Sequence, residues 1–381
     1  MHNNVTTPRT KPLRIAWDNS LTQRNQTGSG VYAARLLEQL SKSNDIHLEV
    51  FGDTPEVSRP QSRVRRAVSF AGSLAWIQWR LPSLLRGRSF DLLHSPAFIA
   101  PVKSPCPKVV TIHDISYLRY PSHFSLGWMT YMKTFMPLAV KSAAAIICGS
   151  EHSRQDIIQA YRLPPDKVRV VPYGIDQQRF HPGAVLDSHW ASGLGIRDGY
   201  LLHVGALAER KNIPALLRAI ANLRSQGKWG SRQLVLAGPA PPGMTGASAV
   251  YETIQQLGLA SSVVLAGHVP DDHIPGLYTH ASALIMPSLY EGFGFPVLEA
   301  MSSGTPVIAS NTSSLPEVAG DAALLVPPLD ERALADAIAN VLASSTTADE
   351  LRSKGLQRAR QFSWERTANK TLEVYRSVAS S

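Results

Sequence analysis

Residues 287–310, PSLYEGFGFPVLEAMSSGTPVIAS, decide the predicted fold. The loop at the start carries Glu291, and neither Gly292 nor Gly294 has a Cβ that would keep a ligand away from the backbone. A short helix is predicted from Phe295, because proline is tolerated in a first helical turn, and VIA after it indicates a buried strand. A glycine loop that leads into a helix N-terminus presents N–H groups and a positive dipole end, which favour an anion such as a diphosphate.

A second carboxylate, Glu299, lies inside the predicted helix, eight residues after Glu291. A wholly helical segment of that length spans roughly 12 Å, whereas the paired carboxylates of glycosidases lie roughly 5–9.5 Å apart. A glycosidase-like acid/base pair is therefore disfavoured, although the glycine loop shortens the distance. Spacing alone leaves two interpretations open. The carboxylates contact different parts of one ligand, or they are a loop carboxylate and a solvent-facing helix glutamate.

The segment between these carboxylates, GFGFPVL, resembles the E-x7-E signature of the retaining GT-B glycosyltransferases of the large family 4. HVGALAERKN, VVPYGID, TIHDISY and SSLPEVAGDAALLVPP are similar to other recurring segments of that family. The resemblance extends from about Leu13 to about Val378. It implies an α/β fold of the GT-B type, in which two doubly wound, Rossmann-like parallel-sheet domains face a central cleft.

The domain organisation also follows from the chain itself. At 381 residues the chain is long for one core, and both halves alternate strands with helices. We place an N-terminal, acceptor-side domain at residues 13–182 and a linker at 183–195. A C-terminal domain that binds a nucleotide sugar follows at 196–360, and residues 361–381 form a helix that crosses back to the first domain.

Composition favours a cytoplasmic protein without a cofactor. Cys106 and Cys148 are the only cysteines, one between prolines and one in an apolar strand, so we expect neither a disulfide framework nor a thiolate metal site. The first dozen residues lack an apolar signal core, and no apolar run approaches the length of a membrane span. No two aspartates are separated by one residue, which argues against a metal-binding D-x-D site for the diphosphate.

The net charge of +9 is unevenly spread, because residues 1–182 carry +11 and residues 183–381 carry −2. Residues 59–88 hold seven arginines, no acidic residue and interleaved tryptophans, a pattern typical of a basic amphipathic helix on an anionic membrane. An ordinary surface helix with core-facing tryptophans is the alternative, and no nucleic-acid-binding motif is present. The predicted membrane contacts are Arg63, Arg65, Arg66, Trp76, Trp79 and Arg80.

Two adjacent cations, Arg210 and Lys211, follow a predicted strand and precede a helix. An arginine fork beside a lysine point charge suits a diphosphate, although an RK pair is more often a solvated loop. The resemblance of HVG…RKN to the family favours phosphate binding. With the E-x7-E segment it implies the donor-binding set Gly205, Arg210, Lys211, Gly292, Phe293, Gly294, Phe295 and Glu299.

Two features of the first half face the same predicted cleft. Gly28 and Gly30 lie in a turn between a strand and a helix, which is weak evidence of a phosphate loop by itself. His113 follows a buried strand, a position where histidines are more often structural than functional. The family resemblance implies that Gly28 and Gly30 lie near the acceptor and the donor phosphates. It also implies that His113 contacts the donor sugar as a catalytic residue.

The resemblance implies a retaining, metal-independent hexosyltransferase in which Arg210 and Lys211 stabilise the leaving diphosphate, Glu291 positions the sugar and Glu299 binds the ribose. The HDxxY form at His113 is similar to the mannosyl- and deoxyhexosyltransferase branch. We therefore expect mannose from GDP-mannose as the donor and a lipid-linked or growing surface polysaccharide as the acceptor, reached from the inner face of the cell membrane. The alternatives are a UDP-glucose-type transferase with a soluble acceptor and a non-catalytic nucleotide-sugar-binding subunit.

Overall fold

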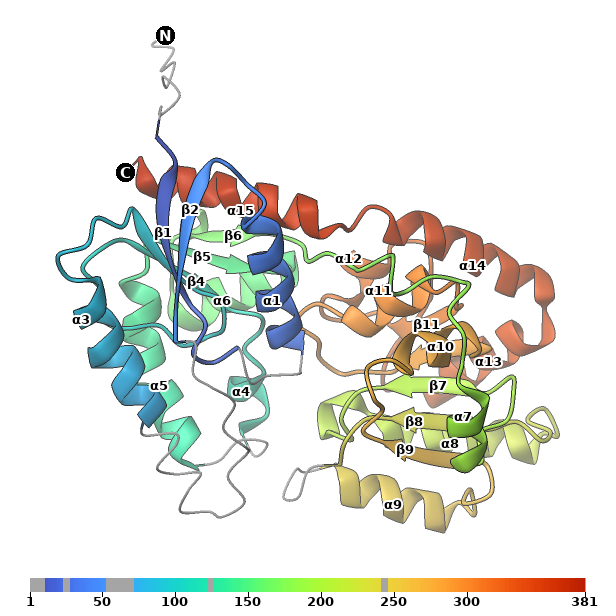
Figure 1. Ribbon diagram of the computed structural model, residues 1–381. Helices are drawn as coiled ribbons and strands as arrows, with labels where there is room; N and C mark the ends of the chain where they lie inside the picture. Colours follow the sequence, from blue (N-terminus) through green and yellow to red (C-terminus); the bar gives the residue numbers. More distant parts are fainter. Residues whose placement is uncertain (1–10, 23–27, 53–71, 122–125, 241–245, 381) are drawn as a thin grey trace, which may run out of the picture.

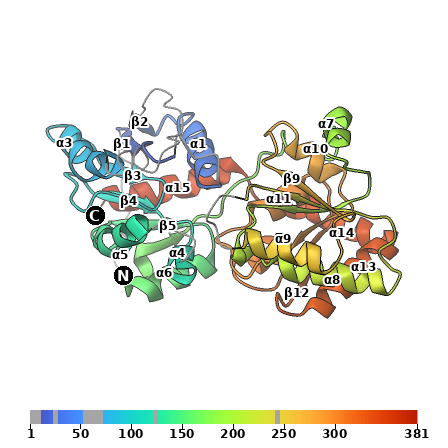
Figure 2. The ribbon, with the colours of Figure 1, turned by 90° about the horizontal axis from the view of Figure 1, so that it is seen from below.

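The computed structural model describes residues 11–22, 28–52, 72–121, 126–240 and 246–380. Two six-stranded parallel sheets, each covered by helices, form the molecule (Figures 1 and 2). The predicted class, a pair of doubly wound α/β domains, is confirmed. Arg63, Arg65 and Arg66 lie outside the described residues. No helix of the described part is both long and apolar enough to cross a membrane.

The first sheet has the strand order β2-β1-β3-β4-β5-β6, and each neighbouring pair is parallel. The order reverses between β1 and β3, the kind of switch point at which ligands bind along the carboxyl edge of an open sheet. The strands are β1 (Leu13–Asp18), β2 (Ile46–Phe51), β3 (Leu92–Ser95), β4 (Lys108–Thr111), β5 (Ala145–Cys148) and β6 (Val168–Val170).

Alternate residues of these strands face opposite layers of helices, as the pleat of a strand requires. In β4, Val109 packs in the core under the helices of one face and Val110 in the core under the other. The helices are α1 (Gly28–Leu40) and α15 (Trp364–Ala379) on the first face, and α5 (Leu126–Lys141) and α6 (Glu151–Tyr161) on the second. Short segments η1 (Trp76–Arg80), α3 (Leu81–Leu85), α4 (Ser116–Arg119) and η3 (Pro165–Lys167) complete this half.

The second sheet repeats the plan with the order β12-β11-β10-β7-β8-β9. Its strands are β7 (Leu201–Val204), β8 (Leu234–Ala237), β9 (Val263–Gly267), β10 (Ala283–Met286), β11 (Val307–Ser310) and β12 (Leu324–Val326). Its helices are η4 (Glu209–Lys211), α8 (Ile213–Ser225), α9 (Ala247–Gln256), α10 (Ile274–Thr279), α11 (Phe295–Ser302), α12 (Leu315–Ala319), α13 (Glu331–Ala343) and α14 (Ser345–Ala359). The predicted helix from Phe295 and the strand after it are thus α11 and β11.

One apolar core is shared by the two halves. Tyr173 at the end of the first half, Phe293 in the second half and Trp364 in the last helix belong to the same cluster of buried side chains. Helix α15 runs back along the first sheet, where it packs against α1 (Figure 1). The segment predicted as a linker contains a helix, α7 (Ser188–Gly193), capped by the Asp187 carboxylate at the Trp190 N–H. The predicted boundaries at 182, 195 and 360 stay a prediction.

Candidate functional site

Glu291 lies in the loop that joins β10 to α11. The loop ends at Gly294, whose φ of +112° is in a region that side chains disfavour. A Cβ there would also lie 2.9 Å from Leu315 Cδ2. Ser314 Oγ donates to the Glu291 and Phe293 carbonyls at 2.9 and 2.8 Å. The loop therefore has one tightly held backbone path into the helix.

The Glu291 carboxylate is buried between the two predicted phosphate-binding cations. Lys211 Nζ donates to Oε1 at 2.7 Å, and Arg210 Nη1 donates to Oε2 at 3.0 Å. Burial alone would raise the pKa of Glu291, but the charges of Lys211 and Arg210 outweigh it and lower the pKa to about 2. Burial lowers the pKa of Lys211, and the Glu291 carboxylate opposes that shift. In this structure the cations neutralise a carboxylate rather than a ligand.

The backbone between β7 and α8 places these cations at the carboxyl edge of the second sheet. Arg210 and Lys211 lie in the one-turn segment η4, which ends at Asn212 with a left-handed φ of 54°. Gly205 follows β7, and a Cβ there would lie 2.9 Å from Lys211 Cε. Gly205 also has a φ of 144°, a region that side chains disfavour, so a glycine suits this position.

Glu299 is held apart from the Glu291 cluster. The Tyr278 hydroxyl donates to Glu299 Oε2 at 2.6 Å. Burial raises the pKa of Glu299, and the hydrogen bond from Tyr278 partly offsets this effect. The two glutamates thus have separate partners in the protein, and the different roles predicted for them stay a prediction. The sequence did not point to Tyr278, because a tyrosine in a short apolar helix is ordinarily a core residue.

His113 follows β4 in the first half and is 9% exposed. Its Nε2 lies 3.2 Å from the Pro96 carbonyl and its Nδ1 lies 2.8 Å from the Tyr173 hydroxyl. A carbonyl only accepts, so Nε2 carries the proton and Nδ1 accepts from the tyrosine. Burial lowers the pKa of His113 to about 4, which keeps the ring neutral. Both ring nitrogens have protein partners here, so a contact with a sugar needs one of these bonds to be exchanged.

Close backbone approaches bring the first half onto the Glu291 loop. A Cβ on Gly292 would lie 2.5 Å from the His113 carbonyl oxygen. A Cβ on Gly28, at the start of α1, would lie 3.2 Å from Phe295 Cδ2. Gly30 is buried in the first turn of the same helix. The structure therefore brings Gly28 and His113 of the first half close to the loop of residues 291–295 in the second half.

The Phe293 and Phe295 side chains pack across the two halves. The Tyr173 ring lies 4.7 Å from Phe293 and stacks on Phe295 at 5.6 Å, and Phe295 stacks on Trp364 at 6.2 Å. The Phe293 and Phe295 side chains thus pack between the two halves. Only the backbone of these two residues remains available to a ligand. The N–H groups of residues 292–295 donate to no other described residue.

The two tryptophans of the basic stretch, residues 59–88, differ in exposure. Trp79 is 69% exposed on η1, and Arg80 beside it is exposed. Trp76 is half-buried and packs against the core, and the membrane contact predicted for it stays a prediction. Positions three apart on a helix are neighbours, so the sequence pattern alone does not separate a core-facing from a solvent-facing tryptophan. A groove of about 500 Å³ runs along this helix between Gly72 and Leu84.

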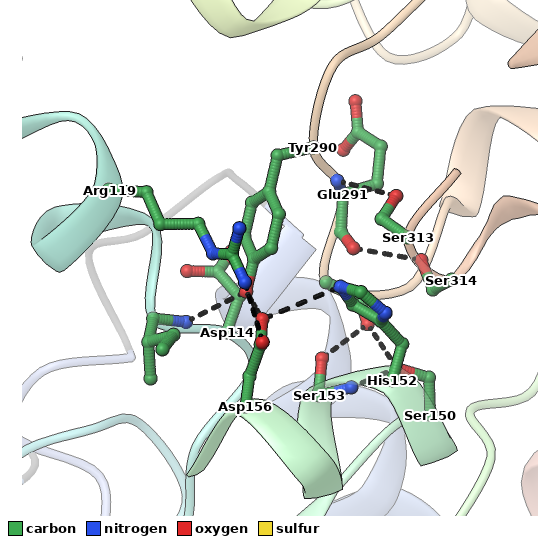
Figure 3. A network of polar contacts seen from close by, with 12 residues as sticks. Asp114, Arg119, Ser150, His152, Ser153, Asp156, Tyr290, Glu291, Ser313 and Ser314 are labelled. Carbon is green, nitrogen blue, oxygen red and sulfur yellow. Dashed lines mark hydrogen bonds and ion pairs between the residues drawn. The ribbon is translucent and has the colours of Figure 1, made fainter. Parts of the chain in front are cut away.

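Some residues at the site were missed by sequence reasoning. His203 in β7 is fully buried, with Nδ1 at 2.9 Å from the Ile285 carbonyl and Nε2 without a partner among the described residues. Burial lowers its pKa to about 4. The Tyr290 hydroxyl donates to Asp156 Oδ2, across the two halves, at 2.8 Å (Figure 3). The sequence does carry a signal for His203. A histidine inside an apolar strand is buried and needs a polar partner.

Known proteins of similar sequence and structure share this fold. The chain is 29% identical over 371 residues to the O-antigen chain mannosyltransferase B of Escherichia coli, covering 92% of this chain and 96% of the relative. Sucrose-phosphate synthase of Thermosynechococcus elongatus superposes with a TM-score of 0.72 at 21% identity, covering 97% of this chain and all of that one. Anabaena HepE in complex with UDP and glucose superposes with a TM-score of 0.70 at 21% identity, covering 96% and 100%.

The family comparison divides the chain as the two sheets do. Residues 27–179 match Glycosyltransferase Family 4, and residues 187–361 match Glycosyl transferases group 1. The first region holds most of the first sheet, with His113, and the second holds Arg210, Lys211 and both glutamates. The chain therefore belongs to the family 4 glycosyltransferases of GT-B fold.

Proposed function

We propose that this glycosyltransferase moves a hexose with retention from a nucleoside-diphosphate sugar, with mannose from GDP-mannose as the first candidate. The observation that carries the proposal is the buried triad of Glu291, Arg210 and Lys211 at the carboxyl edge of the second sheet. Two cations held 3.0 and 2.7 Å from a single carboxylate form a ready site for a doubly charged diphosphate. A full-length relative whose name is O-antigen chain mannosyltransferase B supports mannose.

The leaving diphosphate takes on negative charge in the transition state, and stabilising that charge is the main catalytic effect. Arg210 and Lys211 supply fixed positive charge for it, and the unpaired N–H groups at the start of α11 add donors. Glu291 then exchanges its cationic partners for hydroxyls of the sugar, while Glu299 accepts from the ribose. We propose that Arg210 and Lys211 take the place of a metal ion at the diphosphate. A phosphate oxygen of the leaving group then accepts the proton of the acceptor hydroxyl.

Ligand entry requires the two halves to separate. Lys211, Glu291 and His113 are all less than a tenth exposed, and the Gly292 backbone of the second half closely approaches the His113 carbonyl of the first. Opening would expose the triad, and closure around the donor would return His113 and the Gly292 backbone to the sugar. Closure of this kind excludes water from the reaction, which limits hydrolysis of the donor.

The acceptor in this proposal is a lipid-linked or growing surface polysaccharide at the inner face of the cell membrane. The exposed Trp79 with Arg80 supports contact between this surface and an anionic membrane. A vesicle-flotation assay tests it, with phosphatidylcholine vesicles that contain or lack phosphatidylglycerol. Arg80→Glu changes the surface charge by two and is expected to weaken binding on the order of 30-fold, since each charge near such a surface contributes about 1 kcal/mol. Arg332→Glu, at an 89% exposed side chain of the second half, is the matched control.

A turnover assay tests the proposed reaction. Release of nucleoside diphosphate is measured with GDP-mannose and UDP-glucose, with and without EDTA, and with octyl or methyl α-mannoside as the acceptor. We expect GDP-mannose and the octyl acceptor to react fastest, without an effect of EDTA. A preference for UDP-glucose and the methyl acceptor would favour a UDP-sugar transferase with a soluble acceptor, which the UDP and glucose in the HepE complex also support. No turnover with any donor would favour a non-catalytic nucleotide-sugar-binding subunit.

A further inference from the structure

The N-terminal turn of α6, in the first half, is occupied by a carboxylate of the second half. The Glu151 N–H donates to Glu317 Oε2 at 2.7 Å, and the His152 N–H donates to Oε1 at 2.7 Å. These N–H groups have no partner within their own helix, and the helix dipole favours a negative charge there. Glu317 belongs to the first turn of α12, so these two hydrogen bonds join α12 to the N-terminus of α6.

The same turn of α6 holds the backbone directly after Glu291. The hydroxyls of Ser150 and Ser153 donate to the Gly292 carbonyl at 2.9 and 3.0 Å. Ser150 also caps α6 by accepting from the Ser153 N–H. Both serines are almost fully buried, at 2% and 0% exposed, so a carbonyl that lost them would be left unpaired.

The residue directly before Glu291 is held by the next turn of α6. Tyr290 is 2% exposed, and its hydroxyl donates to Asp156 Oδ2 at 2.8 Å. Burial raises the pKa of Tyr290, which therefore stays a neutral donor. Arg119 donates to the other carboxylate oxygen at 2.7 Å, and its guanidinium lies 5.0 Å from the centre of the Tyr290 ring. In Figure 3 the Tyr290 side chain points to Asp156, and Glu291 points the opposite way.

We propose that α6 and its partners position Glu291 for the reaction. The α6 seat, defined as Ser150, Ser153, Asp156 and the two N–H groups that bind Glu317, holds the residues on either side of Glu291. Because these partners belong to the other half of the molecule, Glu291 reaches its working position only when the halves close. Tyr290 and Asp156 are thus positioning residues that act through Glu291. This inference rests on the proposed sugar transfer.

The hydrogen bond between Tyr290 and Asp156 offers the sharpest test. Tyr290→Phe removes one hydroxyl and keeps the ring, and Asp156→Asn keeps the size of the side chain. We expect each variant to lower kcat on the order of 10-fold to 100-fold, as small displacements of a positioned group do. The affinity for GDP, measured by calorimetry, stays at the wild-type value, because Arg210 and Lys211 are untouched. The double variant is expected to be no slower than Asp156→Asn, because the hydroxyl that Tyr290→Phe removes acts through Asp156, whose ion pair with Arg119 the second substitution also weakens.

Asp45→Asn is the control, because it breaks an exposed ion pair to Arg376 on α15, away from the seat. It is expected to keep the wild-type kcat. The inference is overturned if Tyr290→Phe and Asp156→Asn keep it too, or if they lose GDP affinity in proportion to kcat.

Small-angle X-ray scattering separates this inference from the proposed function. We expect the double variant to have a larger radius of gyration than the wild type, since the halves lose a contact that holds them closed. If the wild type transfers no sugar, the proposed function fails, and scattering alone tests whether the α6 seat holds the halves together. Identical scattering profiles of the wild type and the double variant would then overturn the role of the seat.

Discussion

Replacing Glu291 with glutamine removes the negative charge between Arg210 and Lys211 and keeps the shape of the side chain. The carboxyl pKa falls from its ordinary 4.5 to about 2 in the folded protein. At 1.36 kcal/mol per pKa unit this shift corresponds to about 3 kcal/mol of stability. Breaking a buried ion pair by removing one partner commonly costs about 3–5 kcal/mol, which agrees in size. We therefore expect the free energy of unfolding of Glu291→Gln to fall by about 3 kcal/mol at neutral pH.

The pH dependence of this loss has a definite sign. A carboxyl whose folded pKa is lowered stabilises the protein above its unfolded pKa, and that stability disappears as the pH falls from 4.5 towards 2. Glutamine resembles the protonated acid. The difference between the wild type and Glu291→Gln should therefore be constant above pH 4.5 and shrink below it.

The same substitution is expected to strengthen the binding of a nucleoside diphosphate while it abolishes turnover. In the unliganded protein, Glu291 occupies the two cations that the diphosphate needs, so its removal frees them. Chemical denaturation measures the loss of stability, and calorimetry with GDP and UDP measures the affinity. A variant that is as stable as the wild type, or that binds both diphosphates more weakly, would refute the reasoning.

Three further substitutions test other parts of the site. Gly292→Ala places a Cβ 2.5 Å from the His113 carbonyl, so we expect kcat to fall strongly while the affinity for GDP is retained. Gly193→Ala, which has open space around it, is the control and should leave both kcat and GDP affinity unchanged. Tyr278→Phe removes the donor to Glu299 and should weaken GDP binding about 10-fold by calorimetry, as expected for one hydrogen bond to a charged group; unchanged affinity would separate Glu299 from the ribose. Burial lowers the pKa of His113 from 6.5 to about 4, so the unfolded chain binds a proton that the folded one excludes, and stability falls as the pH falls through this range. His113→Gln should flatten that slope in denaturation curves, and an unchanged slope would contradict a buried neutral ring.

The local pattern of the sequence was sufficient to predict those parts of the site that are formed by one continuous segment. Glu291, the glycines after it and the proline in the first turn of α11 predicted a loop, a helix start and a buried strand, and the structure has all three. Ser150 is a residue type favoured at the N-cap, and it accepts from the Ser153 N–H directly before α6. In each case the residue types restrict the backbone within a few positions, so no distant contact had to be known.

The local sequence pattern did not predict the contacts between the two halves. Tyr290 and Asp156 are 134 positions apart, and nothing in either segment indicates that the two halves meet there. His113 was assigned to the sugar, yet its ring nitrogens face Tyr173 and Pro96 in the closed molecule. Such contacts depend on how two separately folded sheets are placed, which local periodicity does not encode.

A crystal structure with GDP-mannose bound tests the central claim most directly. We predict diphosphate oxygens within hydrogen-bond distance of Arg210 and Lys211, a ribose hydroxyl on Glu299, and Glu291 turned from the cations to the sugar. A nucleotide bound elsewhere, with the ion pairs of Glu291 to Arg210 and Lys211 intact, would contradict the account.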